Sequence, residues 1–277
     1  MRPTPTVMAS TAPILSPSAS AGSVRSFPRR LADGATTTVH MAAYRRDRVA
    51  VRVVALEAAE PLESWCGRTG VSDALVGGFF VTSVGIPLGE LWVGGRRLAS
   101  VPFDPPSGPA RSCVAVDGRR VRLDGRRRLP ASPRGDLLQA GPLLVRGGRP
   151  VVVDGDDPEG FSEGRAQFDS DICDGRHPRA ALGLTPEALL ALVCDGRAEG
   201  EAGLTLEELA VLMAELGARR AINLDGGGSA ALVAGGRLLN TPREAGGAEI
   251  PGGRSIATAL AFAPPGRPQP TATAASS

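Results

Sequence analysis

Short runs of apolar and β-branched residues recur along the chain, and paired turn residues separate them. The pairs are Gly94-Gly95, Gly147-Gly148, Gly235-Gly236 and Asp117-Gly118. Glycine tolerates the left-handed dihedrals of two-residue hairpin turns, and Asp-Gly is typical of a type I′ turn. We therefore predict antiparallel hairpins over residues 91–98, 113–123, 143–153 and 231–239, and a further strand over 48–56.

Helical signals are few and lie in the second half of the chain. Thr205 and Glu208 form a capping-box pattern, apolar residues follow at helical spacing, and Gly217 is placed to end the helix. Thr185-Pro186 also resembles a helix start, although residues 189–194 fit a buried strand equally well. Residues 221–224 read as a short strand. Strands with a few inserted helices predict a single α+β domain with a mixed, largely antiparallel sheet.

The two ends of the chain differ in composition from its middle. Residues 1–30 and 264–277 are rich in Pro, Ser, Thr and Ala, so we predict disordered tails around a folded domain at 31–263. No run approaches the roughly 18 apolar residues of a membrane helix, and prolines interrupt the segment where a secretion signal would be continuous. We expect a cytoplasmic chain without a membrane partner.

The charged residues exclude several kinds of site. Lysine is absent, so all 31 basic residues are arginine, which suggests a GC-rich bacterial genome and excludes a P-loop or a Schiff-base lysine. The net charge is only +2 and no long basic block occurs, which disfavours nucleic-acid binding. Two histidines and four cysteines without CxxC spacing argue against a zinc site. We expect neither a metal nor a cofactor.

The sharpest local feature is Asp-Gly-Gly-Gly-Ser at residues 225–229, directly after a predicted strand. Without Cβ atoms, the backbone N–H groups of Gly226, Gly227 and Gly228 can turn inward and form an anion-binding nest, to which Ser229 adds a hydroxyl. An acidic residue before such a nest makes sense if Asp225 acts on another part of the same ligand. The alternative is a flexible surface loop in which Asp225 serves as a turn residue.

Several ordered segments carry a family resemblance. They are residues 77–80 with 85–89, 139–145, 178–183, 192–197, 203–210, 221–229 and 254–260. In this order, over residues 70–262, they resemble the phosphodiester glycosidase family. Two positions depart from the family pattern: Val76 stands where the family usually has Asn, and Ala180 where it commonly has Thr. The resemblance implies a hydrolase that cleaves a sugar-1-phosphodiester, so the expected partner is a sugar-phosphate small molecule or a glycan.

The resemblance also implies roles for individual residues. Cleavage at an anomeric carbon needs carboxylates, and the phosphate that leaves needs cations and N–H donors. Asp225 is then the nucleophile or base, Asp195 its partner and Glu208 a possible third acid, although the capping box explains Glu208 and an Asp-Gly turn explains Asp195. Arg179, Arg254, Gly78 and the segment Gly226, Gly227, Gly228 and Ser229 are the expected substrate-binding residues.

A second function fits the same residues. The pocket would bind a phosphorylated glycan or a nucleotide without cleaving it, which the apolar Val76 and Ala180 favour. The sequence leaves the oligomeric state open.

Overall fold

The computed structural model describes residues 23–105, 107–153, 157, 159–161 and 174–266. These residues form three larger β-sheets, one two-stranded sheet and the helices α1 and α2. Every pair of named strands is antiparallel, and a parallel bridge joins Leu88 to Val101. The prediction of a single, largely antiparallel α+β domain is confirmed.

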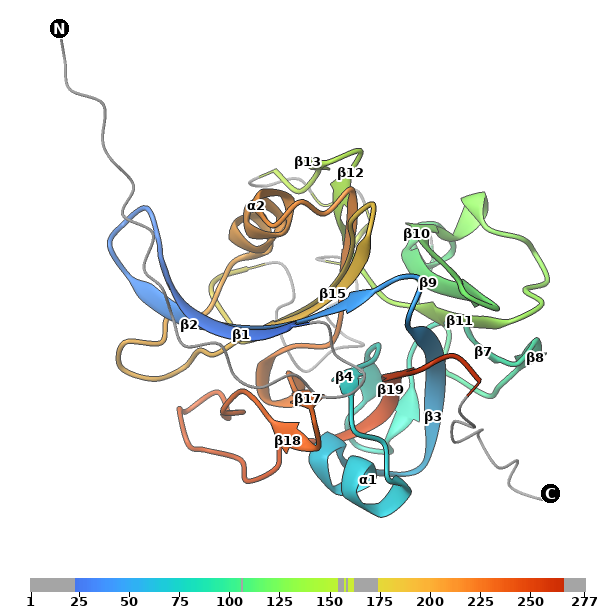
Figure 1. Cartoon of the computed structure of the whole chain (residues 1–277), viewed down its shortest axis with the longest axis horizontal. Helices are drawn as coiled ribbons and strands as arrows, with labels where there is room; N and C mark the ends of the chain where they lie inside the picture. Colours follow the sequence, from blue (N-terminus) through green and yellow to red (C-terminus); the bar gives the residue numbers. More distant parts are fainter. Residues whose placement is uncertain (1–22, 106, 154–156, 158, 162–173, 267–277) are drawn as a thin grey trace, which may run out of the picture.

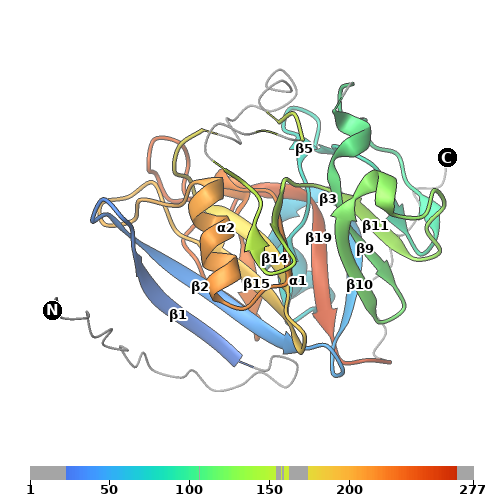
Figure 2. The same ribbon diagram turned by 90° about the horizontal axis from the view of Figure 1, so that it is seen from above.

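The largest sheet has seven strands and carries α2 on one face (Figures 1 and 2). In spatial order its strands are β1 (Ser23–Arg30), β2 (Thr36–Arg45), β15 (Ala188–Cys194), β14 (Arg179–Leu184), β16 (Arg220–Asn223), β12 (Leu143–Arg146) and β13 (Arg149–Pro150). Both faces are apolar: Ala181 and Leu192 pack toward α2, whereas Ala180 and Leu182 pack into the core shared with the other sheets. This explains why every residue of β14 is buried.

The remaining strands form smaller sheets beside the seven-stranded one. One five-stranded sheet contains β18 (Arg237–Leu238), β17 (Leu232–Ala234), β4 (Ala74–Val76), β19 (Ser255–Ala263) and β3 (Ala50–Pro61). The other contains β10 (Arg120–Gly125), β9 (Ser112–Asp117), β11 (Asp136–Gln139), β7 (Leu91–Val93) and β8 (Arg96–Arg97), and β5 (Phe80–Val81) pairs with β6 (Ile86–Pro87). Tyr44 of β2 stacks on Phe262 of β19 with ring centroids 4.5 Å apart, which joins two of the sheets.

The four predicted hairpins are confirmed, with one change of turn type. Both glycines of each Gly-Gly turn have positive φ, as a type I′ turn requires. In the β9–β10 hairpin, Asp117 instead pairs with Arg120, so the turn residues are Gly118 and Arg119, and of these only Gly118 has a positive φ. The prediction of a type I′ turn at Asp117-Gly118 is wrong because the register shifts the turn by one residue; one left-handed position at its start is typical of type II′.

The predicted helix at 205–217 is α2 (Leu206–Glu215), with both hydrogen bonds of its capping box. Helix α1 (Leu62–Thr69) was not predicted; it follows Pro61 and ends at Gly70, whose φ is 71°. The possible helix near Thr185 is wrong and its strand alternative, β15, is confirmed. The Thr185 hydroxyl accepts hydrogen bonds from the N–H groups of Glu187 and Ala188 and so caps a hairpin turn between β14 and β15.

The predicted N-terminal tail extends too far into the chain. Residues 23–30 form β1, which pairs along its whole length with β2. Proline at position 28 is compatible with this pairing because β1 is an edge strand, whose outer side needs no N–H donor. Residues 1–22 and 267–277 lie outside the described part. No helix in the described ranges has the length and apolar character needed to span a membrane.

Candidate active site

Several segments meet at one end of the central strands of the seven-stranded sheet, which we call the site edge. β14 begins where β15 and β16 end, because it is antiparallel to both: Arg179 pairs with Cys194, and Ala181 with Asn223. Asp225 follows β16, and its N–H donates to the carbonyl of Gly77 at 3.0 Å. Since Gly77 follows β4, this bond brings the end of β4 in a second sheet to the same edge.

Of the acidic residues at this end of the sheet, Asp225 has a carboxyl group whose pKa is shifted. Burial raises its pKa to about 7, and this outweighs the opposing effects of the Ser229 hydroxyl, the Gly226 N–H and the Arg254 charge. The Gly226 N–H donates to Oδ1 at 2.9 Å. A carboxyl group with this pKa is present in both protonation states near neutral pH, which is what general acid–base chemistry requires.

The glycine segment after Asp225 is a tight turn and differs from the predicted nest. The Gly226 N–H binds Asp225, the Gly227 N–H donates to Pro178 O at 2.8 Å, and the Ser229 N–H donates to Gly226 O at 3.1 Å. These three N–H groups are used within the protein: one binds the preceding side chain, one binds a distant carbonyl, and one belongs to the 3₁₀ turn of residues 227–229. The glycines are needed for close packing: a Cβ on Gly226 would lie 2.9 Å from Pro178 O, and one on Gly228 would lie 2.7 Å from Ile250 Cδ1.

Two arginines flank the turn. A Cβ on Gly227 would lie 3.1 Å from Nη2 of Arg197, and one on Gly228 would lie 3.2 Å from Nη2 of Arg254. The Arg254 N–H donates to Gly228 O at 3.0 Å, and its Nη2 donates to Glu244 at 2.6 Å. Partial burial and the positive charge of Arg254 lower the pKa of Arg197. Glu244 offsets part of the Arg254 charge, and the two guanidinium groups together still leave a net positive charge that favours an anionic ligand.

Arg197 was not among the predicted site residues. Its Nη1 donates to Arg243 O at 3.0 Å, and its φ of 64° makes it the non-glycine residue with positive φ among the described residues. Such a conformation is unfavourable for a side-chain-bearing residue, and it often marks a functional position. The available signal was its place after Asp195-Gly196 in one of the family-like segments.

Arg179, predicted to bind phosphate, lies in the same region but is buried. Its Nε donates to Leu204 O at 3.0 Å and its Nη2 to Gly175 O at 3.1 Å. A Cβ on Gly226 would lie 3.9 Å from its Cδ. These bonds place Arg179 behind the turn, where it holds the 175 and 204 segments together.

Asp195 is buried and hydrogen-bonded through both oxygens. Oδ2 lies 2.8 Å from Nε2 of His40, and Oδ1 accepts from the N–H of Thr241 at 2.8 Å. The other ring nitrogen of His40 lies 2.8 Å from the Ser26 hydroxyl. Asp195 thus connects β1 and β2 to the segment that begins at Thr241 and continues to Arg254.

Glu208 takes part in the start of α2. Its carboxylate accepts from the Thr205 N–H at 3.0 Å and forms an ion pair with Arg176. Although partial burial opposes the change, the hydrogen bonds from Arg176 and Thr205 lower the pKa of Glu208. Among the described residues, these contacts link Glu208 to neither Asp195 nor Asp225.

Gly78 lies at the joint between β4 and β19. Its N–H donates to the Thr258 hydroxyl at 3.0 Å, and a Cβ on Gly77 would lie 2.4 Å from that hydroxyl. Only glycine fits this approach. Val76 and Ala180, the two departures from the family pattern, are fully buried in one apolar cluster. In the described part of the chain, no group of three or more His, Cys, Asp or Glu residues is placed to hold a metal ion.

Comparison with solved structures gives the same fold. The catalytic domain of zebrafish N-acetylglucosamine-1-phosphodiester alpha-N-acetylglucosaminidase, auto-inhibited by its pro-peptide, is similar with a TM-score of 0.64 and 20% identity, over 86% of this chain and 81% of that one. A hypothetical protein from Synechocystis is similar with a TM-score of 0.60 and 17% identity, over 86% of this chain and 61% of that one. At these identities the two structures establish a shared fold alone. No curated protein sequence matches the chain.

The family follows from the sequence match. The family model for phosphodiester glycosidases covers residues 69–263, well over half of the chain. This range includes the ends of β4, β15 and β16, Asp225 with its glycine turn, and Arg254 before β19. The chain therefore belongs to the phosphodiester glycosidase family.

Proposed function

We propose that the protein is a hydrolase that cleaves a sugar-1-phosphodiester at the anomeric carbon, with Asp225 as its acid–base group. The observation that supports this most directly is the position of Asp225: its carboxyl group has a pKa near 7 and lies at a turn flanked by Arg197 and Arg254. One group that moves a proton and two that stabilise an anion are what this reaction needs.

The chemistry assigns a task to each group. Water adds to the anomeric carbon, the bond from that carbon to the bridging phosphate oxygen breaks, and the phosphate monoester departs with both electrons of the bond. The transition state has oxocarbenium character. On this route, ionised Asp225 takes the proton from the attacking water. On the alternative route, Asp225 attacks the anomeric carbon and displaces the phosphate monoester, and water then hydrolyses the glycosyl–Asp225 ester, which releases the sugar and restores the carboxyl group. The departing phosphate is already acidic, so the two arginine charges replace strong proton donation to the leaving group.

The other predicted carboxylates have supporting tasks in this proposal. Asp195 holds the segment from Thr241 onward, which carries Arg254, because it binds the Thr241 N–H. Glu208 stabilises the start of α2 and stays ionised near neutral pH. Because the N–H groups of Gly226, Gly227 and Ser229 bind groups of the protein, this proposal assigns phosphate binding to the side chains of Arg197 and Arg254.

The test is a screen of sugar-1-phosphodiesters with the wild type and Asp225→Asn. The zebrafish enzyme is named for N-acetylglucosamine-1-phosphodiesters, so these are the first substrates to try. We expect release of free sugar by the wild type and a loss of about 10²–10⁴-fold in the variant. Asp117→Asn, at the exposed last residue of β9, is the matched control and should keep full activity. Wild-type rates in Asp225→Asn would overturn the assignment.

A second function, binding without cleavage, is favoured by one observation. Val76 and Ala180 bury apolar side chains where the family usually has Asn and Thr. Equilibrium binding of a phosphorylated glycan or nucleotide, with no product released on long incubation, would support this function. Release of stoichiometric sugar would exclude it.

A further inference from the structure

Ser26, His40 and Asp195 form a continuous chain of hydrogen bonds outside the chemistry proposed for Asp225. The Ser26 hydroxyl lies 2.8 Å from Nδ1 of His40, and Nε2 of His40 lies 2.8 Å from Oδ2 of Asp195. The three side chains come from β1, from β2 and from the residue that follows β15. A hydroxyl, an imidazole and a carboxylate connected in this order are the groups of a nucleophilic triad, which is recognised by geometry and not by position in the sequence.

The strand register holds Ser26 against His40. Ser26 pairs with His40, and Pro28 with Thr38. The carbonyl of Thr38 accepts from the Asp195 N–H at 2.9 Å, so the backbone groups of Thr38 face β15 and not β1. Backbone direction alternates along a strand, so those of His40 also face β15. Side chains come closest in pairs without backbone hydrogen bonds, and this lets the hydroxyl reach the ring.

The same register leaves the backbone N–H of Ser26 on the outer side of the sheet. β1 is the outermost strand, and a residue in a pair without backbone hydrogen bonds directs its N–H away from the partner strand. Among the described residues, no group beyond β1 accepts from this N–H. The N–H of the nucleophilic residue itself is one of the donors that stabilise the oxyanion in serine hydrolases.

The contacts of His40 determine which ring nitrogen carries the proton. An ionised carboxylate only accepts hydrogen bonds, and Asp195 accepts from the Thr241 N–H through Oδ1 and faces Nε2 of His40 through Oδ2. In the neutral ring, Nε2 therefore holds the proton, and Nδ1 presents its lone pair to Ser26. His40 is buried and Ser26 is half-buried, so the base is shielded while a substrate can reach the hydroxyl.

The side chains next to Ser26 carry no charge. Residues two apart in a strand lie on the same face, so Ser26 shares its face with Val24 and Pro28. Arg29 lies on the other face, where it pairs with Glu215 at the end of α2. Uncharged neighbours and an N–H donor suit the neutral carbonyl of a carboxylic ester, whereas an ionised phosphate group needs cations.

We propose that Ser26 is the nucleophile of a second catalytic site, which hydrolyses an ester with an uncharged acyl group. Ser26 Oγ attacks the carbonyl carbon while its proton passes to Nδ1 of His40, and the carbonyl oxygen becomes an oxyanion beside the Ser26 N–H. The intermediate expels the alcohol, which takes the proton from Nδ1, and an acyl-Ser26 ester remains. Water then attacks this ester and gives a proton to Nδ1, the acid leaves, and Ser26 recovers the proton. Asp195 orients the ring and stabilises its charge, so it is a positioning residue.

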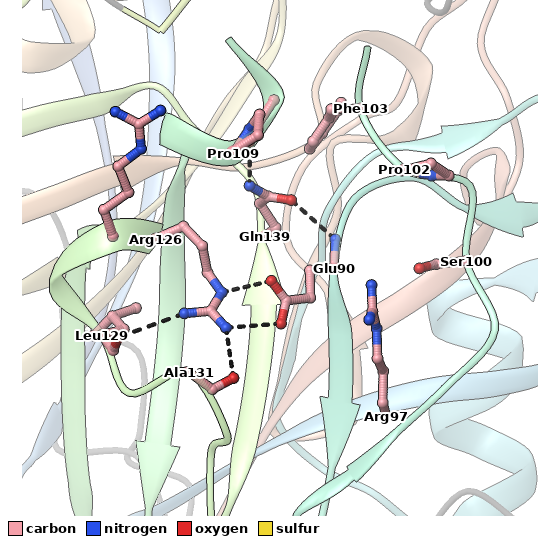
Figure 3. A pocket seen from close by; sticks show the side chains of 12 residues that line it. Glu90, Arg97, Ser100, Pro102, Phe103, Pro109, Arg126, Leu129, Ala131 and Gln139 are labelled. Atoms are coloured by element: carbon pink, nitrogen blue, oxygen red, sulfur yellow. Dashed lines mark hydrogen bonds and ion pairs between the residues drawn. The ribbon is translucent and has the colours of Figure 1, made fainter. Parts of the chain in front are cut away.

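Ser100 provides a comparison within the same chain. It lines a cavity of about 530 Å³ on the sheet formed by β7 to β11 (Figure 3). In this cavity Glu90 is paired with Arg126, and Figure 3 draws no bond from Ser100 to either of them. In the part of the chain that the structure describes, no histidine or carboxylate binds the Ser100 hydroxyl. Ser100 therefore has no base and should not react as a nucleophile.

Labelling of the whole chain with an uncharged fluorophosphonate, followed by mass spectrometry of its peptides, tests the nucleophile. Attack by Oγ forms the O–P bond and expels fluoride, so we expect one label, on Ser26. Ser26→Ala should remove the label and slow the release of p-nitrophenol from p-nitrophenyl acetate about 10²–10⁴-fold. Ser23→Ala is the matched control, because Ser23 is half-buried in the same strand but lies opposite Ala43. No label, a label on Ser100 instead, or wild-type ester hydrolysis in Ser26→Ala would each overturn the proposal.

Asp195→Asn distinguishes a positioning role from a structural one. The amide keeps an oxygen for the Thr241 N–H, while its Nδ2 donates to Nε2 of His40. The ring proton then moves to Nδ1, which no longer accepts from Ser26. For p-nitrophenyl acetate, kcat should fall about 10²–10⁴-fold with KM and the thermal midpoint nearly unchanged. Wild-type kcat in this variant would mean that the chain only joins β1, β2 and β15. These measurements use no sugar phosphodiester, so their outcome is independent of the proposed function.

Discussion

Asp195 and Asp225 arise from the same local pattern and have opposite environments. Each follows a strand at one edge of the seven-stranded sheet, and each precedes a glycine. Both oxygens of Asp195 bind groups from other segments, His40 and the Thr241 N–H. Asp225 is bonded by its own turn, through Gly226 and Ser229, and its pKa is near 7. The same Asp-Gly pair at the end of a strand thus yields one anchoring carboxylate and one that can exchange a proton.

The strongest test of this difference compares turnover in Asp195→Asn and Asp225→Asn. We expect Asp225→Asn to lose about 10²–10⁴-fold, because it removes the acid–base group. Asp195→Asn keeps an oxygen for the Thr241 N–H and should lose less than about tenfold. Steady-state rates on one sugar-1-phosphodiester suffice. Equal losses in the two variants would make Asp195 the second catalytic carboxylate, and the comparison would fail.

The free energy of unfolding should respond in the opposite order, with a larger loss at Asp195 than at Asp225. Asp195→Ala leaves His40 and the Thr241 N–H without their buried acceptor, so it should lower the free energy of unfolding by about 2–4 kcal/mol. Asp225→Ala removes a carboxyl group that burial already disfavours in its charged form, so the cost should be smaller. Urea denaturation of both variants at pH 7 measures the difference. A larger loss of unfolding free energy in Asp225→Ala than in Asp195→Ala would contradict this prediction.

Arg197 extends the comparison to the residue that follows Asp195-Gly196. Arg197→Gln removes one of the two charges beside the glycine turn and should lower kcat/KM about 10- to 100-fold. Arg197→Gly should lower it equally while relieving the left-handed backbone at φ 64°. Arg237→Gln, in an exposed hairpin position, is the control. Unchanged kinetics in Arg197→Gln would remove this residue from the site.

The raised pKa of Asp225 predicts a pH dependence of stability. In the unfolded chain this carboxyl group titrates near 3.9, and in the folded protein near 7. The folded state binds the proton more tightly, so this stabilisation is complete below about pH 4 and is lost as the pH rises through 7. Relative to wild type, Asp225→Asn should gain on the order of 4 kcal/mol between pH 4 and 8 in urea denaturation. If Asp225→Asn instead lost stability relative to wild type between pH 4 and 8, the raised pKa of Asp225 would be contradicted.

Features fixed by local chemistry were predictable from the sequence. The Gly-Gly hairpins and the capping box of α2 each depend on a few adjacent residues, and both are present. The glycine turn after Asp225 was located correctly, but its N–H groups bind Asp225, Pro178 and Gly226. The partner Pro178 lies far away in sequence, so the pattern of glycines alone could not show that these donors are used.

Features fixed by distant partners were missed or left open. Residues 189–194 fit a helix or a strand until β2 and β14 pair with them on either side. Residues 23–30 have the composition of a disordered tail, yet they form a strand because their backbone pairs with β2. Arg197 is one of 31 arginines, and only its place after Asp195-Gly196 in a family-like segment sets it apart in the sequence. The pairing of Asp195 with His40 joins positions far apart in the chain.

Glu208 gives the smallest effect and completes the comparison of the three predicted carboxylates. Its side chain closes the capping box of α2 and pairs with Arg176, so Glu208→Ala should lower the free energy of unfolding by about 1 kcal/mol. Glu207→Ala, an exposed position in the same turn, should cost less and is the control. Glu208→Gln can still accept from the Thr205 N–H, so it should retain most of the stability and all of the turnover. If Glu208→Gln lost turnover about tenfold or more at unchanged stability, Glu208 would belong with Asp225 among the reacting groups, because a purely structural carboxylate affects the rate only through folding.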